Sequence, residues 1–242
     1  MYHGRIFRLD GHLERLYASA RFLGTNLPKE RGELGEVLTD MVARSGLKEA
    51  VVRIAFIPQG RSQARSHIVV QTAQMPSAST YRHGIHVAIV PARPFSIGSI
   101  SPQAKYSARM GSVMAVADAQ LRDVDEALFM HASGFVTEST ASNFCVVRKG
   151  TICTAPYSLG LLAGVTRDVI FELAERLYIP IKETHLTRHD VYNSEEAFLT
   201  STIKEVLAVT LVDGRRIGAG RPGPVTKRLH RAFRQLVRQE MR

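Results

Sequence analysis

V-T-E-S-T-A-S-N-F, the run from Val136 to Phe144, closes the stretch from Lys105 onward that decides the fold of this chain. A strand-like run from Glu126 to His131 and a turn at 132–134 precede it. Glu138 sits among small hydroxyl residues in a strand, which is unusual because acids seldom lie on the inner face of a sheet without a basic partner. We therefore expect Glu138 to meet a basic group.

Between Lys105 and that strand, the sequence has the spacing of a helix. Its apolar residues recur every three or four positions, a pattern that predicts one buried face. The residues expected on that face are Met110, Val113, Met114, Ala117 and Leu121.

Two later stretches add groups that could bind a ligand together with Lys105 and Glu138. One is L-L-A-G-V-T-R-D, from Leu161 to Asp168, which opens a helix, and the other is F-L-T-S-T-I-K-E-V, from Phe198 to Val206. Helix N-termini and hydroxyl-rich turns suit a phosphate. With the amine of Lys105 and the carboxylate of Glu138, the chain has the groups that a pyridoxal phosphate site needs.

These stretches resemble the class IV aminotransferases, the fold-type IV pyridoxal phosphate enzymes. That family includes branched-chain aminotransferases, D-amino-acid aminotransferases and aminodeoxychorismate lyases. The element order, mixed helix and strand followed by a strand-rich half, predicts an α+β fold with two domains. The resemblance implies a small α/β domain over 1–78 and a larger barrel-like domain over 79–242, with the cofactor between them. The Pro/Ser-rich segment from Met75 to Ser79 is the expected linker.

The resemblance assigns roles around the cofactor ring. Lys105 is expected to form the Schiff base with pyridoxal 5'-phosphate and to carry the proton at the substrate α-carbon. Glu138 is expected to keep the pyridine nitrogen protonated, so that the ring accepts electrons. Asn143 is expected to order the local turn behind Glu138, and Leu162 to pack against the ring.

The same resemblance implies how the phosphate is held. The run H-L-E-R-L, from His12 to Leu16, matches a family segment that sends an arginine to the phosphate, and a guanidinium suits that task. The residues expected to contact the phosphate are Arg15, Val165, Thr166, Ser201 and Thr202. Ile203 follows at a position that meets the substrate carboxylate in relatives, where a bulky residue is unexpected. Arg53 faces the substrate in one interpretation and is an ordinary strand arginine in the other.

Several elements outside these stretches are also predicted. A helix is expected from Asp10 to Leu23, with Asp10 as its N-cap. A second amphipathic helix passes through Leu34 and Val42 and is closed by Gly46. A Pro/Ser/Gly-rich loop is expected over 95–103.

Composition excludes some classes of protein. The chain has 242 residues, 45% of them hydrophobic, and no apolar run of transmembrane length or signal-peptide character. Two cysteines make no disulfide framework, so we expect a reducing cytoplasm, and nine histidines without ligand spacing predict no metal site. The net charge of +10 comes from dispersed residues with few aromatics, which favours a solvated basic surface over nucleic-acid binding.

Three functions remain open from the sequence. The first is an aminotransferase that moves an amino group between an amino acid, branched-chain or D, and a 2-oxo acid. The run from Val212 to Thr226 resembles the aminotransferase branches more than the lyases. The second is aminodeoxychorismate lyase chemistry on the same scaffold, and the third is a shortened, non-enzymatic relative.

The resemblance also implies a homodimer and a segment before the position of Met1 that nothing here matches. We therefore expect a small domain that lacks its first strands, with an exposed sheet edge.

Overall fold

The computed structural model describes residues 1–59, 63–91, 101–107 and 110–241. It has an α+β fold that divides into two compact units. The first comprises Met1–Met75, Ala104–Tyr106 and Arg234–Arg242, and the second comprises Pro76–Gln103 and Ser107–Phe233. The domain boundary expected after residue 78 stays a prediction. The loop expected over 95–103 falls mainly on 92–100, outside the described residues.

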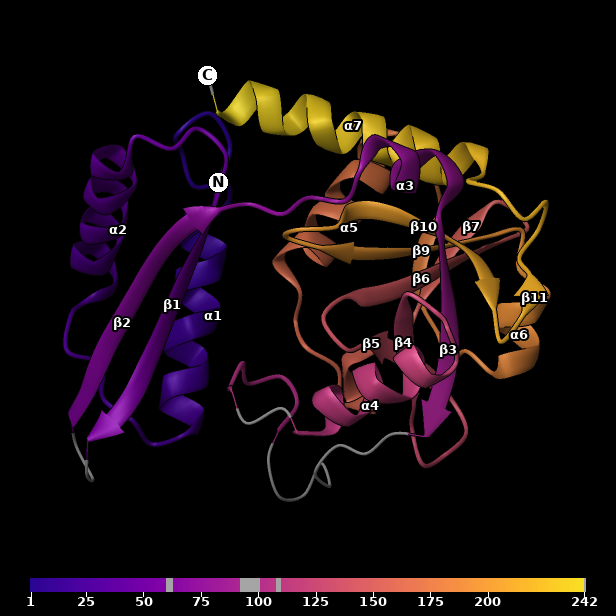
Figure 1. The fold of residues 1–242 in the computed structure, drawn as a ribbon, viewed down its shortest axis with the longest axis horizontal. Helices are drawn as coiled ribbons and strands as arrows, with labels where there is room; N and C mark the ends of the chain where they lie inside the picture. Colours follow the sequence, from indigo (N-terminus) through magenta and orange to yellow (C-terminus); the bar gives the residue numbers. More distant parts are fainter. Residues whose placement is uncertain (60–62, 92–100, 108–109, 242) are drawn as a thin grey trace. The chain divides into compact units, whose positions relative to one another are not determined.

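The first unit packs two helices against a β-hairpin (Figure 1). Helices α1 and α2 span Leu9–Phe22 and Arg31–Ser45, and the antiparallel strands β1 and β2 span Ala50–Gln59 and Gln63–Thr72. The shared core contains the buried residues Leu13, Leu34 and Leu38 and the partly buried Leu16, Val52, Ile54, Phe56 and Ile68. The apolar residues of each helix are three or four positions apart, so each helix buries one face in this core.

The ends of these helices confirm one expectation and correct another. Gly46 closes α2 with φ of 66°, a left-handed conformation that glycine adopts without steric cost. Asp10 was expected to be the N-cap of α1, and this prediction is wrong. The helix already begins at Leu9, with Arg8 in the capping position. Asp10 instead lies in the first turn, where its charge complements the helix dipole.

The second unit is built on a closed ring of strands (Figure 1). Strand pairing runs from β3 through β4, β5, β6, β9 and β10 back to β3. These strands span Ile85–Pro91, Glu126–Met130, Val136–Ser139, Asn143–Arg148, Glu196–Ser201 and Glu205–Val212. β7 (Thr151–Thr154) and β8 (Ile181–Glu183) extend the sheet from β6, and β11 (Arg215–Arg216) pairs with β10. The barrel-like domain implied by the resemblance is confirmed.

Branched and aromatic side chains fill one core of this unit. They include Val87, Ile89, Leu128, Phe144, Val146, Leu199 and Leu207. The remaining helical elements are α3 (Ala78–His83), η1 (Tyr157–Leu159), α5 (Val165–Arg176), α6 (Arg188–Tyr192) and α7 (Pro224–Glu240). Because side chains alternate along a strand, the burial of Phe144 and Val146 in this core leaves Asn143 of β6 on the opposite face.

Helix α4, Met110–Leu121, exists where it was expected but buries the wrong face for that prediction. Met110, Val113 and Leu121 are 65%, 62% and 87% exposed, and Met114 and Ala117 are exposed as well. The small residues Ala115 and Ala119 pack instead on Val90 and Ala127 of β3 and β4. Small side chains let a helix approach a sheet closely, so the expected apolar face turns to solvent.

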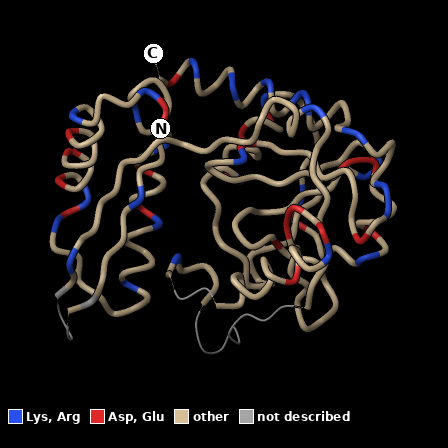
Figure 2. Tube along the Cα trace, viewed as in Figure 1, with Lys and Arg blue, Asp and Glu red and all other residues tan. Residues whose placement is uncertain are grey.

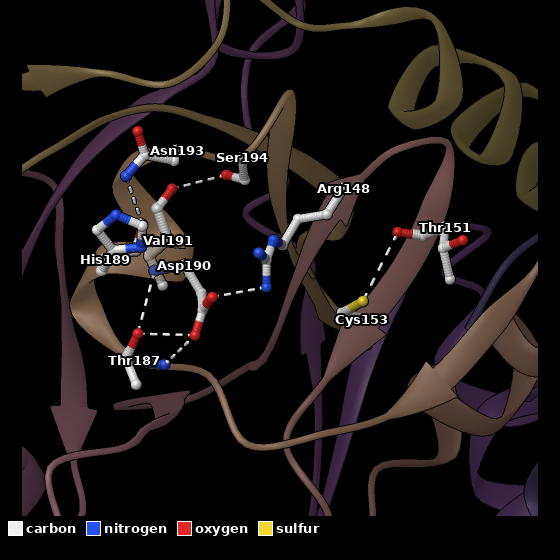
Figure 3. A network of polar contacts seen from close by, with 9 residues as sticks. All are labelled: Arg148, Thr151, Cys153, Thr187, His189, Asp190, Val191, Asn193 and Ser194. Atoms are coloured by element: carbon white, nitrogen blue, oxygen red, sulfur yellow. Dashed lines mark hydrogen bonds and ion pairs between the residues drawn. The ribbon is translucent and has the colours of Figure 1, made fainter.

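A capped helix anchors the far end of β6 (Figure 3). Thr187 and Asp190 form a capping box at the start of α6, in which the Asp190 carboxylate accepts from Thr187 N at 2.9 Å and Thr187 Oγ1 at 2.7 Å. Arg148 Nη1 pairs with Asp190 Oδ1 at 2.6 Å. Burial alone would raise the pKa of Asp190, but the Thr187 hydrogen bonds and the Arg148 charge lower it below the ordinary value.

Charge is spread over both units, with a basic run along α7 (Figure 2). Across the described ranges, no helix is both long and apolar enough to cross a membrane. The same ranges contain no group of three His, Cys, Asp or Glu side chains arranged to hold a metal ion.

Candidate active site

The predicted site residues divide between the two units. Arg15, Arg53 and Lys105 belong to the first unit. The second unit contains Glu138, Asn143, Leu162, Val165, Thr166, Ser201, Thr202 and Ile203.

One face of α1 in the first unit links Arg15 to Lys105. His12, Arg15 and Ser19 are spaced three and four residues apart, which puts them on one side of the helix. The Ser19 hydroxyl donates to Arg15 O at 2.7 Å and accepts from Lys105 N at 3.0 Å. Because Ser19 is only 5% exposed, this link fixes the backbone of Lys105 against α1.

His12 is a neutral imidazole next to these cations. Burial lowers the pKa of His12 to about 4, and the charges of Arg15, Lys105 and the N-terminus act in the same direction. The Arg15 Nη2 atom lies 3.4 Å from His12 Nδ1, where a neutral ring nitrogen accepts a hydrogen bond. The first unit therefore gathers positive charge around a group that itself carries none at neutral pH.

Glu138 in the second unit is held by two donors. Its Oε2 accepts from Asn143 Nδ2 at 3.1 Å and from Leu162 N at 3.1 Å. Glu138 and Asn143 are register partners of β5 and β6, so their side chains share a face of the sheet. Asn143 Nδ2 also donates to Leu162 O at 3.0 Å. The arrangement fixes one carboxylate beside the loop that leads into α5.

That loop places a helix N-terminus close to the carboxylate. The N-cap of α5 is Gly164, which has no side chain to accept from the first-turn N–H groups of Val165 and Thr166. A Cβ atom at position 164 would lie 1.9 Å from Asn143 Oδ1, so only glycine fits there. Thr166 is 6% exposed and adds a hydroxyl to this turn. The α5 terminus thus offers N–H groups and a dipole suited to an anion.

The turn between β9 and β10 lies at the same end of the sheet. Antiparallel pairing puts Thr200, near the end of β9, opposite Asn143, the first residue of β6. The 201–204 turn that follows β9 therefore lies beside the start of β6. Ser201 Oγ accepts from Lys204 N at 3.1 Å and shapes the turn. Ser201 and Ile203 are half-buried, and Thr202 is exposed. Sheet register therefore brings together motifs that lie far apart in the sequence.

Two buried hydroxyls lie in the same region of the second unit as Glu138 and Asn143. Within the described part of the chain, Thr200 Oγ1 and Ser142 Oγ are buried and have no hydrogen-bond partner. Unpaired buried polar atoms are costly and call for an explanation. Thr200 is the register partner of Asn143, so its side chain lies on the face of the sheet that carries Asn143 and Glu138. The donors and acceptors present fit pyridoxal phosphate: a carboxylate for its ring nitrogen and a helix N-terminus for its phosphate.

Arg53 is placed differently from the other predicted residues. It lies exposed on β1, in register with Val69 of β2. Its role at the substrate stays a prediction, and its position equally suits a strand arginine in solvent.

Sequence reasoning missed three residues that hold the site segments. Ser19 joins Arg15 to Lys105, and Glu126 and Lys204 form an ion pair next to the turns of the second unit. Ser19 could have been found from its spacing of four residues after Arg15 on a helix. The pairing of Glu126 with Lys204 spans 78 residues and had no local signal.

Comparison with known proteins matches this architecture. The family model of amino-transferase class IV covers residues 1–212. A branched-chain-amino-acid aminotransferase of Pseudomonas aeruginosa is 30% identical over an alignment of 253 positions, and the match covers 96% of this chain and 78% of that protein. A D-alanine aminotransferase of Listeria monocytogenes is 28% identical, over 96% of this chain and 83% of that protein.

Solved structures agree with this assignment. The T.th. branched-chain amino acid aminotransferase with pyridoxamine 5'-phosphate superposes with a TM-score of 0.91 at 28% identity, over 96% of this chain and 79% of that one. The same enzyme complexed with N-(5'-phosphopyridoxyl)-L-glutamate gives a TM-score of 0.89. The family model matches most of the chain, and the hydrogen-bonding groups of the second unit suit the cofactor. This chain belongs to the class IV aminotransferases, enzymes that transfer amino groups with pyridoxal phosphate.

Proposed function

We propose that this aminotransferase acts on branched-chain amino acids, with Lys105 as the catalytic lysine and Glu138 as the partner of the cofactor ring. The observation that carries the residue assignment is the anchoring of Glu138 Oε2 by Asn143 Nδ2 and Leu162 N, each at 3.1 Å. The substrate class rests on the names of the relatives, among them the enzymes of Pseudomonas aeruginosa and Escherichia coli.

In this proposal the residues divide the tasks between the cofactor ring, its phosphate and the substrate proton. Pyridoxal phosphate, when bound, supplies an electron sink for the bond broken at the substrate α-carbon. Glu138 orients the ring and holds a proton at the pyridine nitrogen. The Lys105 amine takes up and returns the proton of the α-carbon. Arg15 and the α5 N-terminus at Val165 and Thr166 bind the phosphate, together with Ser201 and Thr202.

D-amino acids are the second candidate substrate class. The observation that favours them is the D-alanine aminotransferase of Listeria monocytogenes, which matches 96% of this chain. Assays with both enantiomers of leucine and alanine, each with 2-oxoglutarate and with pyruvate as acceptor, decide between the two classes.

We infer that the working unit is a homodimer. The support is α4, whose exposed side chains Met110, Val113, Met114 and Leu121 form an apolar face of the second unit. The helix carries Asp118 as its one charged residue in a chain of net charge +10. Two copies can therefore meet along this face with little charge repulsion, as a self-complementary interface requires.

We also propose a reducing compartment, the cytoplasm, as the place of action. Cys145 and Cys153 are both unbridged and buried. Burial raises the pKa of the Cys145 thiol to about 11, so the thiol stays protonated and inert.

The experiment that tests the catalytic assignment uses borohydride. Wild-type protein loaded with pyridoxal phosphate should absorb as a Schiff base, and reduction should fix the cofactor on the peptide containing Lys105. Lys105→Ala should lose both the reducible attachment and turnover, because one amine serves both tasks. Lys48→Ala, which removes another exposed lysine of the first unit, is the control and should behave as wild type. Reducible cofactor at wild-type level in Lys105→Ala would place the chemistry on another lysine.

A further inference from the structure

Glu126, the first residue of β4, has a buried carboxylate that reaches two separate turns of the second unit. Its Oε1 accepts from the Thr140 hydroxyl and from Ala127 N, the latter at 3.1 Å, and its Oε2 pairs with Lys204 Nζ. Glu126 is 6% exposed. A buried charge is tolerated only when it is paired and hydrogen-bonded. The carboxylate of Glu126 therefore depends on these contacts, and they in turn hold the residues that make them.

The first turn reached by Glu126 joins β5 to β6. Thr140 comes two residues after Glu138 and is 5% exposed. The turn is closed by Ser139 N, which donates to Ser142 O at 2.8 Å. A hydrogen bond from Thr140 to Glu126 therefore anchors the loop between the predicted ring partner and Asn143.

The second turn joins β9 to β10. Its Lys204 extends to Glu126, while Lys204 N donates to Ser201 Oγ at 3.1 Å and Lys204 O accepts from Tyr81 at 3.3 Å. The next residue, Glu205, has φ of 52° and is 2% exposed, and its Oε2 lies 2.9 Å from His230 Nε2. A non-glycine residue held in the left-handed region shows that the surroundings dictate the path of this turn.

We propose that Glu126 is a positioning residue that couples these two turns. By holding Thr140 with one oxygen and Lys204 with the other, it fixes the spacing between Glu138 and the Ser201–Thr202 pair. The coupling is a property of the protein alone. Its consequence for the cofactor rests on the proposed function, in which one turn meets the ring and the other meets the phosphate.

Hydrogen exchange of the cofactor-free protein tests the coupling. Glu126→Gln keeps the side-chain volume but removes the charge, so amide exchange should rise in both 139–143 and 201–206. Thr140→Val should raise exchange in the first segment and Lys204→Met in the second. Unchanged exchange in both segments of a folded Glu126→Gln protein would overturn the proposal.

Glu196→Gln is the matched control. Glu196 is also 6% exposed and also belongs to the second unit, but its carboxylate accepts from Val225 N at 2.9 Å and from Thr226 N at 2.8 Å at the start of α7. This variant should lower stability without changing exchange in the two turns. Equal effects of Glu126→Gln and Glu196→Gln on the turns would mean general loosening and would contradict the coupling.

A cycle of variants then tests the consequence for the cofactor. In the wild-type background, Thr140→Val and Lys204→Met should each weaken pyridoxal phosphate binding several-fold, measured by the dissociation constant. In the Glu126→Gln background, either change should add less than a further factor of about two, because coupled residues do not act additively. Effects that multiply in both backgrounds would overturn the positioning role.

The two proposals fail in different ways. If wild-type protein binds no pyridoxal phosphate while exchange in both turns still responds to Glu126→Gln, the residue assignment fails and the coupling stands. If Lys105 is confirmed but exchange does not respond, the coupling fails and the assignment stands. If Glu126→Gln does not fold, the responses of Thr140→Val and Lys204→Met still decide, since coupling predicts that each also perturbs the opposite turn in exchange, though less than its own.

Discussion

At the scale of single residues, Glu138 shows how a strand position becomes chemically specific. Its carboxylate is aimed by one backbone N–H and one side-chain amide, both fixed by sheet register and by the loop before α5. In the proposed role, a carboxylate oriented in advance holds the positive charge of the protonated pyridine nitrogen, so the ring can accept electrons from the α-carbon without reorganisation of the protein.

The first prediction concerns that charge. Glu138→Gln keeps the side-chain volume and a hydrogen-bonding oxygen, so the protein should remain folded and retain the cofactor. Removal of the α-proton should slow by on the order of a hundredfold or more, comparable with losing one oriented electrostatic contact. Rapid-mixing absorbance of the half-reaction measures this rate. A wild-type rate would make Glu138 a structural strand residue.

The second prediction concerns His12, whose pKa is lowered to about 4 by burial and by neighbouring cations. An NMR titration should show the ring of His12 changing charge near pH 4, and Arg15→Gln should raise this pKa. Because the unfolded chain binds the proton near the ordinary value of about 6.5, His12 disfavours folding progressively as the pH falls from about 6.5 to 4. A titration near 6.5 in the folded protein would contradict the burial of this ring.

At the scale of elements, caps decide where helices begin. The Thr187 and Asp190 capping box starts α6 with three hydrogen bonds between the two residues, of 2.7, 2.9 and 3.2 Å (Figure 3). Arg148 of β6 adds an ion pair at 2.6 Å from the sheet. The Asp190 carboxylate therefore both caps a five-residue helix and, through Arg148, ties it to the barrel.

The third prediction follows from the lowered pKa of Asp190. Asp190→Asn should destabilise the protein by about 1–2 kcal/mol at pH 7, since it weakens the cap and removes the ion pair. A lowered folded pKa means that this contribution is complete above the unfolded value and is lost as the pH falls through the folded one. Urea unfolding at pH 7 and at pH 3 should therefore show the difference between the two proteins shrinking in acid.

Arg148→Met separates the two contributions of Asp190. The Arg148 side chain is 42% exposed, so the ion pair should contribute less to stability than the cap. A larger loss in Arg148→Met than in Asp190→Asn would assign the stability to the charge pair.

Helix α4 is the element for which sequence periodicity misled. A period of three and four reports that one face is apolar, and it does not report what covers that face. The alanines of the other face are small enough to pack closely on β3 and β4, so that face is the one buried against the sheet.

At the scale of the whole molecule, the exposed face of α4 underlies the fourth prediction. Met114→Glu, on a residue that is 42% exposed in one copy, should weaken self-association by at least about a hundredfold, because burying an unpaired carboxylate costs several kcal/mol. Sedimentation over a range of protein concentrations measures the effect. Tyr178→Glu, at a residue that is 95% exposed elsewhere on the second unit, is the control and should leave association unchanged. Equal association of Met114→Glu and wild type would rule out α4 as the contact.

Local sequence patterns predicted the main helices and the strand-rich second half, and short motifs pointed to the family that the comparisons show. Local patterns predicted α1 and α2 as helices, and the run from Leu161 to Asp168 predicted the helix that begins as α5 at Val165. The short motifs around Lys105, Glu138 and Thr166 pointed to one cofactor because few sites need an amine, a carboxylate and a helix N-terminus together.

Tertiary contacts, which no local pattern predicts, hold those residues in place. The closure of the barrel, the register that places Thr200 opposite Asn143, and the Glu126 carboxylate between two turns all join residues far apart in the chain. Local sequence carries no signal for such contacts, because they depend on how strands pair and on which charge is left to be satisfied after burial. The same reason explains why the face of α4 that packs on the sheet could not be read from its hydrophobic pattern.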